Sequence, residues 1–353
     1  MNEIAIVGLD LAKHVFQIHG ADASGRTVLK RKLRRREVLA FFACLKPCVV
    51  AMEACATAHF WARQIAKAGG HAVKLIPPQY VRPYVRRNKN DAADAAAICE
   101  AASRPEMRFC AIRTAEQQTA LTLHRTRALL VKQRTMLANA IRCHLAEYGY
   151  IEPQGINNLA ERVTDLAAGT IPEDAPQALS PALRALAAQF LSLSREIVTI
   201  EQEIAQWHAS QEESRRLASI PGIATVTATA LTASVGDVSH FKSAREFAAW
   251  IGLTPRQNSS GGKEKLGRIS KRGDPYLRRL LVNGASVIIR HANGTGKIAR
   301  SALGAWVRDL LARKPRMLVA VALANKLARI AWAVLTKKTA YRSADGNAMQ
   351  ASG

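Results

Sequence analysis

The sequence predicts an α/β domain at the N-terminus, a long helical middle region and a mostly helical, basic C-terminal domain. Three observations lead to this fold class. Short β-rich runs alternate with helical runs at the start of the chain, the middle has long stretches without Gly or Pro, and cations concentrate in the last third. A chain of 353 residues is long enough for two or three domains. We expect domains over residues 1–112, 113–212 and 213–341, with a tail over 342–353.

The first domain is predicted to begin with three strands, over residues 4–9, 15–19 and 27–33, because β-branched and apolar residues recur there between turn residues. The elements that follow alternate between helix and strand: 36–45 (helix), 49–52 (strand), 56–68 (helix), 72–76 (strand) and 91–102 (helix). A meander of three strands followed by this alternation is the order of the ribonuclease H-like α/β fold.

The middle region is predicted to hold two long helices, over residues 114–148 and 181–211, with a loop rich in Pro and Gly between them. Apolar residues in the second helix are spaced alternately by three and four: Leu183, Leu186, Phe190, Leu193, Ile197, Ile200, Ile204 and Trp207. This heptad pattern is typical of a coiled coil and requires a partner helix. The partner is either the first long helix, in an intramolecular hairpin, or a second copy of the chain, and the two arrangements are compatible.

The charge balance indicates a polyanionic partner. Lys and Arg number 51 against 27 Asp and Glu, which gives a net charge of +24 and a pI near 10.4. A membrane surface is the rival explanation, but the most apolar stretch, residues 317–335, carries Lys326 and Arg329 and therefore reads as a packed helix. Because the N-terminus lacks the features of a signal peptide, we expect a cytoplasmic protein without a membrane partner.

The cysteines do not predict a zinc site. They form no CxxC pair, and Cys44 and Cys48 have no His partner at zinc-finger spacing. We therefore expect reduced thiols at all six positions: Cys44, Cys48, Cys55, Cys99, Cys110 and Cys143.

Four carboxylates are candidates for a metal site in the first domain. Asp10 ends the first predicted strand and Glu53 follows the fourth, so the two lie side by side if these strands are neighbours. Asp91 and Asp94 are spaced i, i+3, which places both on one face of a helix. Each acid taken singly could be a helix cap or a surface charge. Together they suit two hard divalent ions, Mg²⁺ or Mn²⁺, of the kind that support phosphoryl transfer.

The segments GLDLAK, AMEA and KNDAADA resemble the DEDD motif of the insertion-sequence transposases of family one-hundred-ten. Their N-terminal domain is similar to the RuvC Holliday-junction resolvase. The resemblance extends to about Tyr341 and is strongest to the subgroup typified by insertion sequence eleven-eleven. It implies that Asp10, Glu53, Asp91 and Asp94 are the catalytic metal ligands.

The C-terminal domain contains a predicted helix-hairpin-helix over residues 217–237, whose Pro221–Gly222 turn could present backbone N–H groups to phosphate. Ala224 replaces the second glycine often found in this motif, so the turn is either a phosphate contact or a packing motif. Between Arg256 and Arg316 there are fifteen Lys or Arg against three acids. Seven cations of this region are candidate phosphate contacts: Lys263, Lys265, Arg268, Lys271, Arg272, Arg278 and Arg279.

The loop before Asp274 and Pro275, which mark a helix start, holds two serines, two glycines and several cations. Its chemistry alone favours a linker with DNA-contacting lysines over a nucleophile. The family resemblance implies instead that Ser260, with Ser259 as the alternative, forms a covalent link to DNA. It also implies a structured guide RNA that pairs with target and donor DNA. Because the serine and the acids lie in separate predicted domains joined by long helices, we expect them to come from different subunits of a dimer or tetramer.

Two further basic runs, residues 26–36 and 82–89, are candidate backbone contacts, and aromatics at 5% argue against a base-stacking platform. The resulting hypothesis is a composite site in which the acids hold two ions and Ser260 attacks the scissile phosphate. The rival functions are a resolvase-like nuclease that uses water and a binding protein without chemistry.

Overall fold

The structure, a computed structural model, describes residues 3–85, 91–258 and 265–342. The chain divides into two compact units. Unit 1 comprises residues 1–118 with 235–237, and unit 2 comprises residues 119–234 with 238–353.

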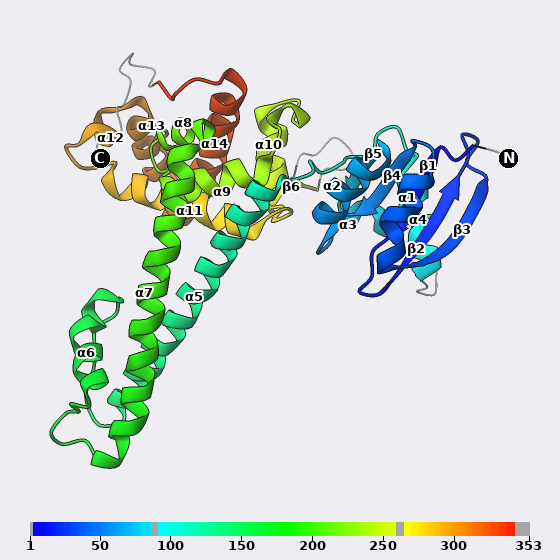
Figure 1. Ribbon diagram of the computed structural model, residues 1–353. Coiled ribbons are helices and arrows are strands. Elements are labelled where there is room, and N and C mark those ends of the chain that lie inside the picture. The colour runs from blue at the N-terminus through cyan, green and yellow to red at the C-terminus, as the bar shows by residue number, and fades with distance from the viewer. Residues whose placement is uncertain (1–2, 86–90, 259–264, 343–353) are drawn as a thin grey trace. The chain divides into compact units, whose positions relative to one another are not determined.

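Unit 1 contains a five-stranded mixed sheet in the order β3-β2-β1-β4-β5 (Figure 1). The strands β1, β2 and β3 form an antiparallel meander, and β4 and β5 continue the sheet parallel to β1. The predicted meander of three strands, followed by alternating helices and strands, is therefore confirmed. The bounds are β1 Ile6–Asp10, β2 Val15–Ala21, β3 Thr27–Arg34, β4 Val49–Glu53 and β5 Ala72–Ile76.

The two faces of the sheet are covered by different helices. One face packs its apolar side chains, such as Leu9, Phe16 and Met52, against α1 (Val38–Cys44) and α2 (Ala58–Gly69). The opposite face is covered by α4 (Asp91–Ala102), which packs across β1 and β2 (Figure 1). Because side chains alternate along a strand, each strand residue can be assigned to one of these two faces.

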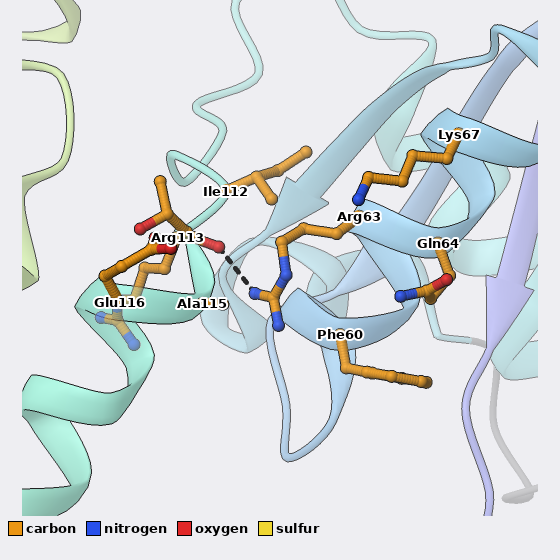
Figure 2. Close-up of a pocket in the computed structure, with 9 residues that line it drawn as sticks. Phe60, Arg63, Gln64, Lys67, Ile112, Arg113, Ala115 and Glu116 are labelled. Atoms are coloured by element: carbon orange, nitrogen blue, oxygen red, sulfur yellow. Dashed lines mark hydrogen bonds between the residues drawn. The ribbon is translucent and has the colours of Figure 1, made fainter.

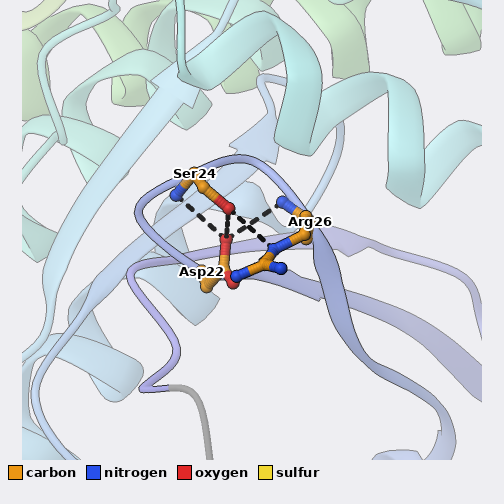
Figure 3. Close-up of polar contacts among 3 residues, drawn as sticks. All are labelled: Asp22, Ser24 and Arg26. Carbon is orange, nitrogen blue, oxygen red and sulfur yellow. Dashed lines mark hydrogen bonds and ion pairs between the residues drawn. The ribbon is translucent and has the colours of Figure 1, made fainter.

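Asp22 closes the hairpin between β2 and β3 (Figure 3). Its Oδ1 accepts hydrogen bonds from the backbone N–H groups of Ser24 and Arg26, at 2.9 and 3.0 Å, and from the Ser24 hydroxyl at 2.6 Å. The Arg26 guanidinium also lies 3.4 Å from Asp22 Oδ2. This turn leaves Arg26 paired with an acid, unlike the cations that follow it along β3.

Unit 2 is helical and begins with two long helices that lie side by side, α5 (Ala115–Ala146) and α7 (Ser180–Ser210) (Figure 1). Arg127 of α5 is paired with Glu201 of α7. The prediction that residues 153–176 form only a loop is wrong, since α6 (Ala160–Ala168) lies there. Leu159, Val163 and Leu166 bury one face of this helical segment against α5 and α7, and the flanking Pro and Gly residues concealed its periodicity.

The heptad pattern of α7 divides into two halves with different burial. Leu183, Phe190, Ile197 and Ile204 are buried, whereas the alternate members Leu186, Leu193, Ile200 and Trp207 are half-buried. Leu183 and Phe190 pack in one core cluster with residues of α5 and α6, so the intramolecular arrangement accounts for this part of the buried seam. The dimer interface stays a prediction.

Four of the remaining helices of unit 2 pack against α14 (Arg316–Lys337), namely α8, α10, α11 and α13. Among the described residues, α14 alone is long and apolar enough to cross a membrane, and half of its most apolar window is buried inside the unit, as in a core helix. The other elements are α8 (Glu212–Ala218), α9 (Thr225–Val235), α10 (Ala244–Ile251), β6 (Pro255–Gln257), β7 (Leu266–Ile269), α11 (Pro275–His291), α12 (Lys297–Arg300) and α13 (Ala302–Leu311).

The turn between α8 and α9 packs closely against α11. Gly222 in this turn has φ +80°, and a Cβ there would lie 2.8 Å from the carbonyl oxygen of Gly284 on α11. The helix, turn and helix therefore occur in the predicted order, and the turn has a packing role. Phosphate binding by its backbone stays a prediction.

Candidate active site

The C-terminal ends of β1 and β4 bring Asp10 and Glu53 to one edge of the sheet. The parallel register pairs Leu9 with Met52, so the next residue on each strand is an acid. Leu9 and Met52 face α1 and α2, and alternation therefore turns Asp10 and Glu53 toward the face covered by α4. The predicted neighbourhood of the first and fourth strands is confirmed.

Gly8 allows α4 to approach β1 on this face. A Cβ at Gly8 would lie 2.2 Å from the carbonyl oxygen of Ala95 and 2.6 Å from the backbone nitrogen of Cys99. Any larger residue would therefore collide with the backbone of α4. Gly8 precedes Asp10 by two residues and shares its face, so the close approach brings the first turn of α4, with Asp91 and Asp94, over Asp10. No sequence pattern around Gly8 predicted this role.

The carboxylate oxygens of Asp10, Asp91 and Asp94 lie within 4.8 Å of one another. Asp10 and Asp94 are half-buried and Asp91 is exposed, so the group is open to solvent on one side. Both helical acids belong to the first turn of α4, where the helix dipole favours negative charge. Three of the four predicted ligands therefore meet at one point.

The electrostatics of the site destabilise its charged form. The pKa of Asp10 is raised from 3.8 to about 6, first by burial and then by the negative charges of Asp94, Asp91 and Glu53. A hydrogen bond from the backbone of Leu11 offsets part of this rise. Glu53 lies outside the 4.8 Å group, yet its charge acts on Asp10. The fourth predicted acid is thus electrostatically coupled to Asp10.

The donor set fits a hard divalent cation. Among residues 3–85, 91–258 and 265–342, no ion pair involves Asp10, Asp91 or Asp94, so their repulsion is not relieved by a described Lys or Arg. All donor atoms are carboxylate oxygens, which suit Mg²⁺, Mn²⁺ or Ca²⁺ and not the softer metals that thiolates bind. Within the same described ranges, this is the sole group of three or more His, Cys, Asp or Glu residues that could hold a metal ion.

Two family comparisons match this organisation. The family described as "Transposase" under the name DEDD_Tnp_IS110 matches residues 7–150, which contain all four acids. The family described as "Transposase IS116/IS110/IS902 family" matches residues 214–315.

Curated relatives extend the match to nearly the full chain. A Yersinia enterocolitica protein named "Transposase for insertion sequence element IS1328" is 44% identical over 97% of this chain and 99% of its own length. The Coxiella burnetii "Transposase for insertion sequence element IS1111A" is 41% identical over 97% of this chain and 92% of its own length. A Pseudomonas aeruginosa protein named "Probable family 20 transposase" is 46% identical over 95% of this chain and 98% of its own length. This chain belongs to the IS110 family of transposases. The predicted family and subgroup are confirmed.

The transposase carries its predicted serine outside the described residues. Ser259, Ser260 and Lys263 all fall in the segment 259–264. The chain on either side of that segment forms the two-stranded sheet of β6 and β7, where the backbone N–H of Asn258 donates to the carbonyl of Lys265 at 2.9 Å. The helix start predicted at Asp274 and Pro275 is confirmed, since Asp274 caps α11 by accepting from the N–H of Tyr276 at 2.7 Å.

The predicted phosphate contacts of unit 2 occupy different environments. Lys265, just before β7, Arg268 on β7, and Lys271 and Arg272 in the turn after it are exposed. Arg278, in contrast, donates from Nη1 to the carbonyl oxygens of Ile251, Arg272 and Gly273. It therefore holds the turn before α11 in place. The guanidinium of Arg279 lies 5.3 Å from the ring centre of Tyr276.

The transposase also has a basic pocket of about 520 Å³ in unit 1, on the outer side of α2 (Figure 2). Phe60, Arg63 and Lys67 line it from α2, and Arg113 and Glu116 line it from the chain that leads into α5. Arg63 donates to the carbonyl of Arg113 at 2.7 Å. Since α2 covers the face of the sheet opposite to α4, this pocket is separate from the acidic site.

A buried histidine cluster in unit 2 was not predicted. His124 of α5 lies 3.0 Å from the hydroxyl of Tyr276 and 2.9 Å from that of Thr229. Burial, followed by the charge of Arg127, lowers the pKa of His124 to about 4 and keeps it neutral. These residues come from α5, α9 and α11, and they are too far apart in the sequence for any spacing rule to connect them.

Proposed function

We propose that the transposase cuts and rejoins DNA strands at a composite site built from the acids of unit 1 and Ser260 of unit 2. The observation that carries the proposal is the approach of the Asp10, Asp91 and Asp94 oxygens to within 4.8 Å, with no described ion pair to relieve their repulsion. The family membership supports DNA as the substrate.

In this proposal the carboxylates of Asp10, Glu53, Asp91 and Asp94 hold two divalent ions, Mg²⁺ or Mn²⁺. When bound, such ions favour deprotonation of the attacking oxygen and stabilise the departing one. The Ser260 hydroxyl oxygen attacks the scissile phosphorus, loses its proton, and becomes bonded to it while the bond from phosphorus to the leaving sugar oxygen breaks. The leaving oxygen takes up a proton. Attack by another strand's hydroxyl reverses these steps and releases Ser260.

The surroundings of residues 259–264 support a role in phosphate chemistry. Lys265, Arg268, Lys271 and Arg272 are exposed near this segment, and cations there stabilise the negative charge of the reacting phosphate. Lys263 is proposed to act with them, and Arg279 to hold DNA at the start of α11. Because Arg278 binds three backbone carbonyls, its contribution rests on positioning the turn.

We also propose that the working enzyme is an oligomer with a guide RNA. The exposed apolar side chains of Leu129 and Met136 on α5 (55% and 61%) and of Val198 on α7 (52%) support a further copy along the helical hairpin. The net charge of +24 supports binding of a second nucleic acid. Base pairing by an RNA would then supply the choice of sequence, as in other RNA-guided proteins. Such a protein acts on bacterial DNA in the cytoplasm.

The proposal is tested with purified transposase, the DNA of its element's ends, the RNA transcribed beside its gene, and Mg²⁺, quenched in SDS. We expect a denaturation-resistant protein–DNA adduct that disappears in Ser260→Ala and in EDTA, while Ser259→Ala retains it. Cleavage without an adduct, indifferent to Ser260, would instead support a resolvase-like nuclease that uses water. DNA binding without any cleavage would support a binding protein.

The oligomeric form of the site has its own test. If the acids and Ser260 act together from different subunits, mixing the inactive variants Asp10→Asn and Ser260→Ala restores part of the adduct, because one mixed arrangement contains both intact halves. Mixtures that never regain activity would argue for a site within one chain.

A further inference from the structure

The basic run over residues 26–36 is divided by the sheet into two groups of cations. The register of β2 and β3 pairs Phe16 with Leu33 and Gln17 with Lys32. Phe16 and Leu33 belong to the core beneath α1 and α2, so Lys32 lies on the opposite face, as do Lys30 and Arg34 at two-residue spacing. All three side chains are exposed.

Three of the other four cations of the run, Arg26, Arg31 and Arg35, are engaged elsewhere. The Arg31 guanidinium lies 5.6 Å from the ring centre of Phe41 on α1. Arg35 lies 5.0 Å from the Trp61 ring and 6.0 Å from Phe16, also on the helix-covered face. Such cation–π contacts stabilise the packing of these side chains. Arg26 is paired with Asp22.

Lys30 and Lys32 share cross-strand rows with the acidic site. Asp10 pairs with Gln17, which pairs with Lys32, and Gly8 pairs with His19, which pairs with Lys30. The positive charge of Lys30, after burial, lowers the pKa of His19, in keeping with their position on one face. Adjacent strands are about 4.8 Å apart, so β3 lies roughly 10 Å from β1, while successive ladder positions are about 6.6 Å apart.

We propose that Lys30, Lys32 and Arg34 form a phosphate-binding ladder for the DNA strand that crosses the acidic site. A strand with its scissile phosphate at Asp10 places its neighbouring phosphates near β3, where three exposed cations face the same side. Negative phosphates complement this ladder, whereas the adjoining acids would repel them without it. The inference rests on the proposed function only in taking the acidic site as the place of cleavage.

The test compares two variants that remove charge from the same run. Lys30→Gln/Lys32→Gln/Arg34→Gln removes the ladder, and Arg31→Gln/Arg35→Gln removes the two cations of the other face. Binding to a fluorescent single-stranded oligonucleotide of the element's end is measured in EDTA over a range of KCl, so that chemistry does not contribute. The ladder variant should reduce the slope of log Kd against log [KCl] by about 2, since each phosphate contact on a single strand contributes about 0.7. The control variant should keep the wild-type slope.

Position is tested by replacing single phosphates of the oligonucleotide with neutral methylphosphonates. Wild-type protein should lose affinity at two or three consecutive positions to one side of the cleavage site, and the ladder variant should be insensitive at those positions. Melting curves for both variants, and the single Lys32→Gln variant, guard against loss of the fold.

Three outcomes would overturn the inference. Equal slope changes in both variants would indicate diffuse charge, and an unchanged interference pattern would place the phosphates elsewhere. Weaker binding of an RNA of the same sequence, with DNA binding intact, would assign the ladder to RNA. Because binding is measured in EDTA, these results do not depend on cleavage. A failure of the proposed chemistry can therefore be distinguished from a failure of this inference.

Discussion

The acidic site of unit 1 and the His124 cluster of unit 2 both place polar side chains between packed elements, but their hydrogen bonding differs. His124 has a partner for each ring nitrogen, and the Thr229 hydroxyl in turn donates to the carbonyl of Thr225 at 2.7 Å. The pKa of Asp10 is raised first by burial and then by the charges of three other carboxylates. A cluster whose members satisfy one another contributes to stability, whereas a cluster of like charges destabilises the fold until a cation binds.

Asp10→Asn should have the largest effect that separates the acidic site from the His124 cluster. Loss of one charged ligand should reduce DNA cleavage by at least about 10²- to 10³-fold, as removal of an electrostatic stabiliser usually does. The same variant should melt at the wild-type temperature or above it in EDTA, because the repulsion is reduced. Asp22→Asn, which weakens a satisfied turn and its ion pair, is the control and should melt lower. A less stable Asp10→Asn protein would show that the acids are structural.

Gly8→Ala should break the acidic site without altering any carboxylate. The new methyl group would force α4 away from β1, at a cost of about 3 kcal/mol in unfolding free energy, the upper range for overpacking. Separation of Asp10 from Asp91 and Asp94 should also weaken the rise in melting temperature that Mn²⁺ produces. Gly296→Ala, at a position where an added Cβ would meet nothing within 4 Å apart from its chain neighbours, should change neither quantity.

His124→Ala should destabilise unit 2 by about 2 kcal/mol, because the buried hydroxyls of Tyr276 and Thr229 each lose a partner. Chemical denaturation measures this change, and His144→Ala on the exposed side of the same helix is the control. Equal stability of the two variants would mean that the cluster contributes nothing.

The smallest expected effect is a pH dependence of the metal-free protein. The pKa of Asp10 is about 6 in the folded protein against 3.8 in an unfolded chain, so the folded state binds more protons between these values. The stability that protonation of Asp10 contributes to the folded protein is therefore lost as pH rises from about 4 to 6, and it stays lost above that range. The difference in melting temperature between Asp10→Asn and wild type in EDTA should widen over this interval. A constant difference in melting temperature would show that folding does not raise the pKa of Asp10.

The sequence was informative where chemistry coincides with the end of an element. Asp10 and Glu53 could be placed together because they follow neighbouring strands, and the i, i+3 spacing of Asp91 and Asp94 is local. The sequence was uninformative where strand register or helix packing decides which side chains meet. The register of β3 with β2 decides that Lys32 and Arg31 lie on opposite faces of the sheet. The contact between His124 and Tyr276 depends on how the helices pack. Helix α6 was missed because short periodicity between Pro and Gly residues resembles a loop.

Gly8 has a consequence for the history of mobile DNA. Copies of an insertion sequence accumulate substitutions once selection no longer maintains them, and inspection of the four carboxylates is the natural way to separate intact genes from relics. A copy that retains all four acids and carries Val or Leu at position 8 would nevertheless be a relic, because its proposed metal ligands could not converge. Genomic surveys of such elements should therefore score this glycine together with the acids.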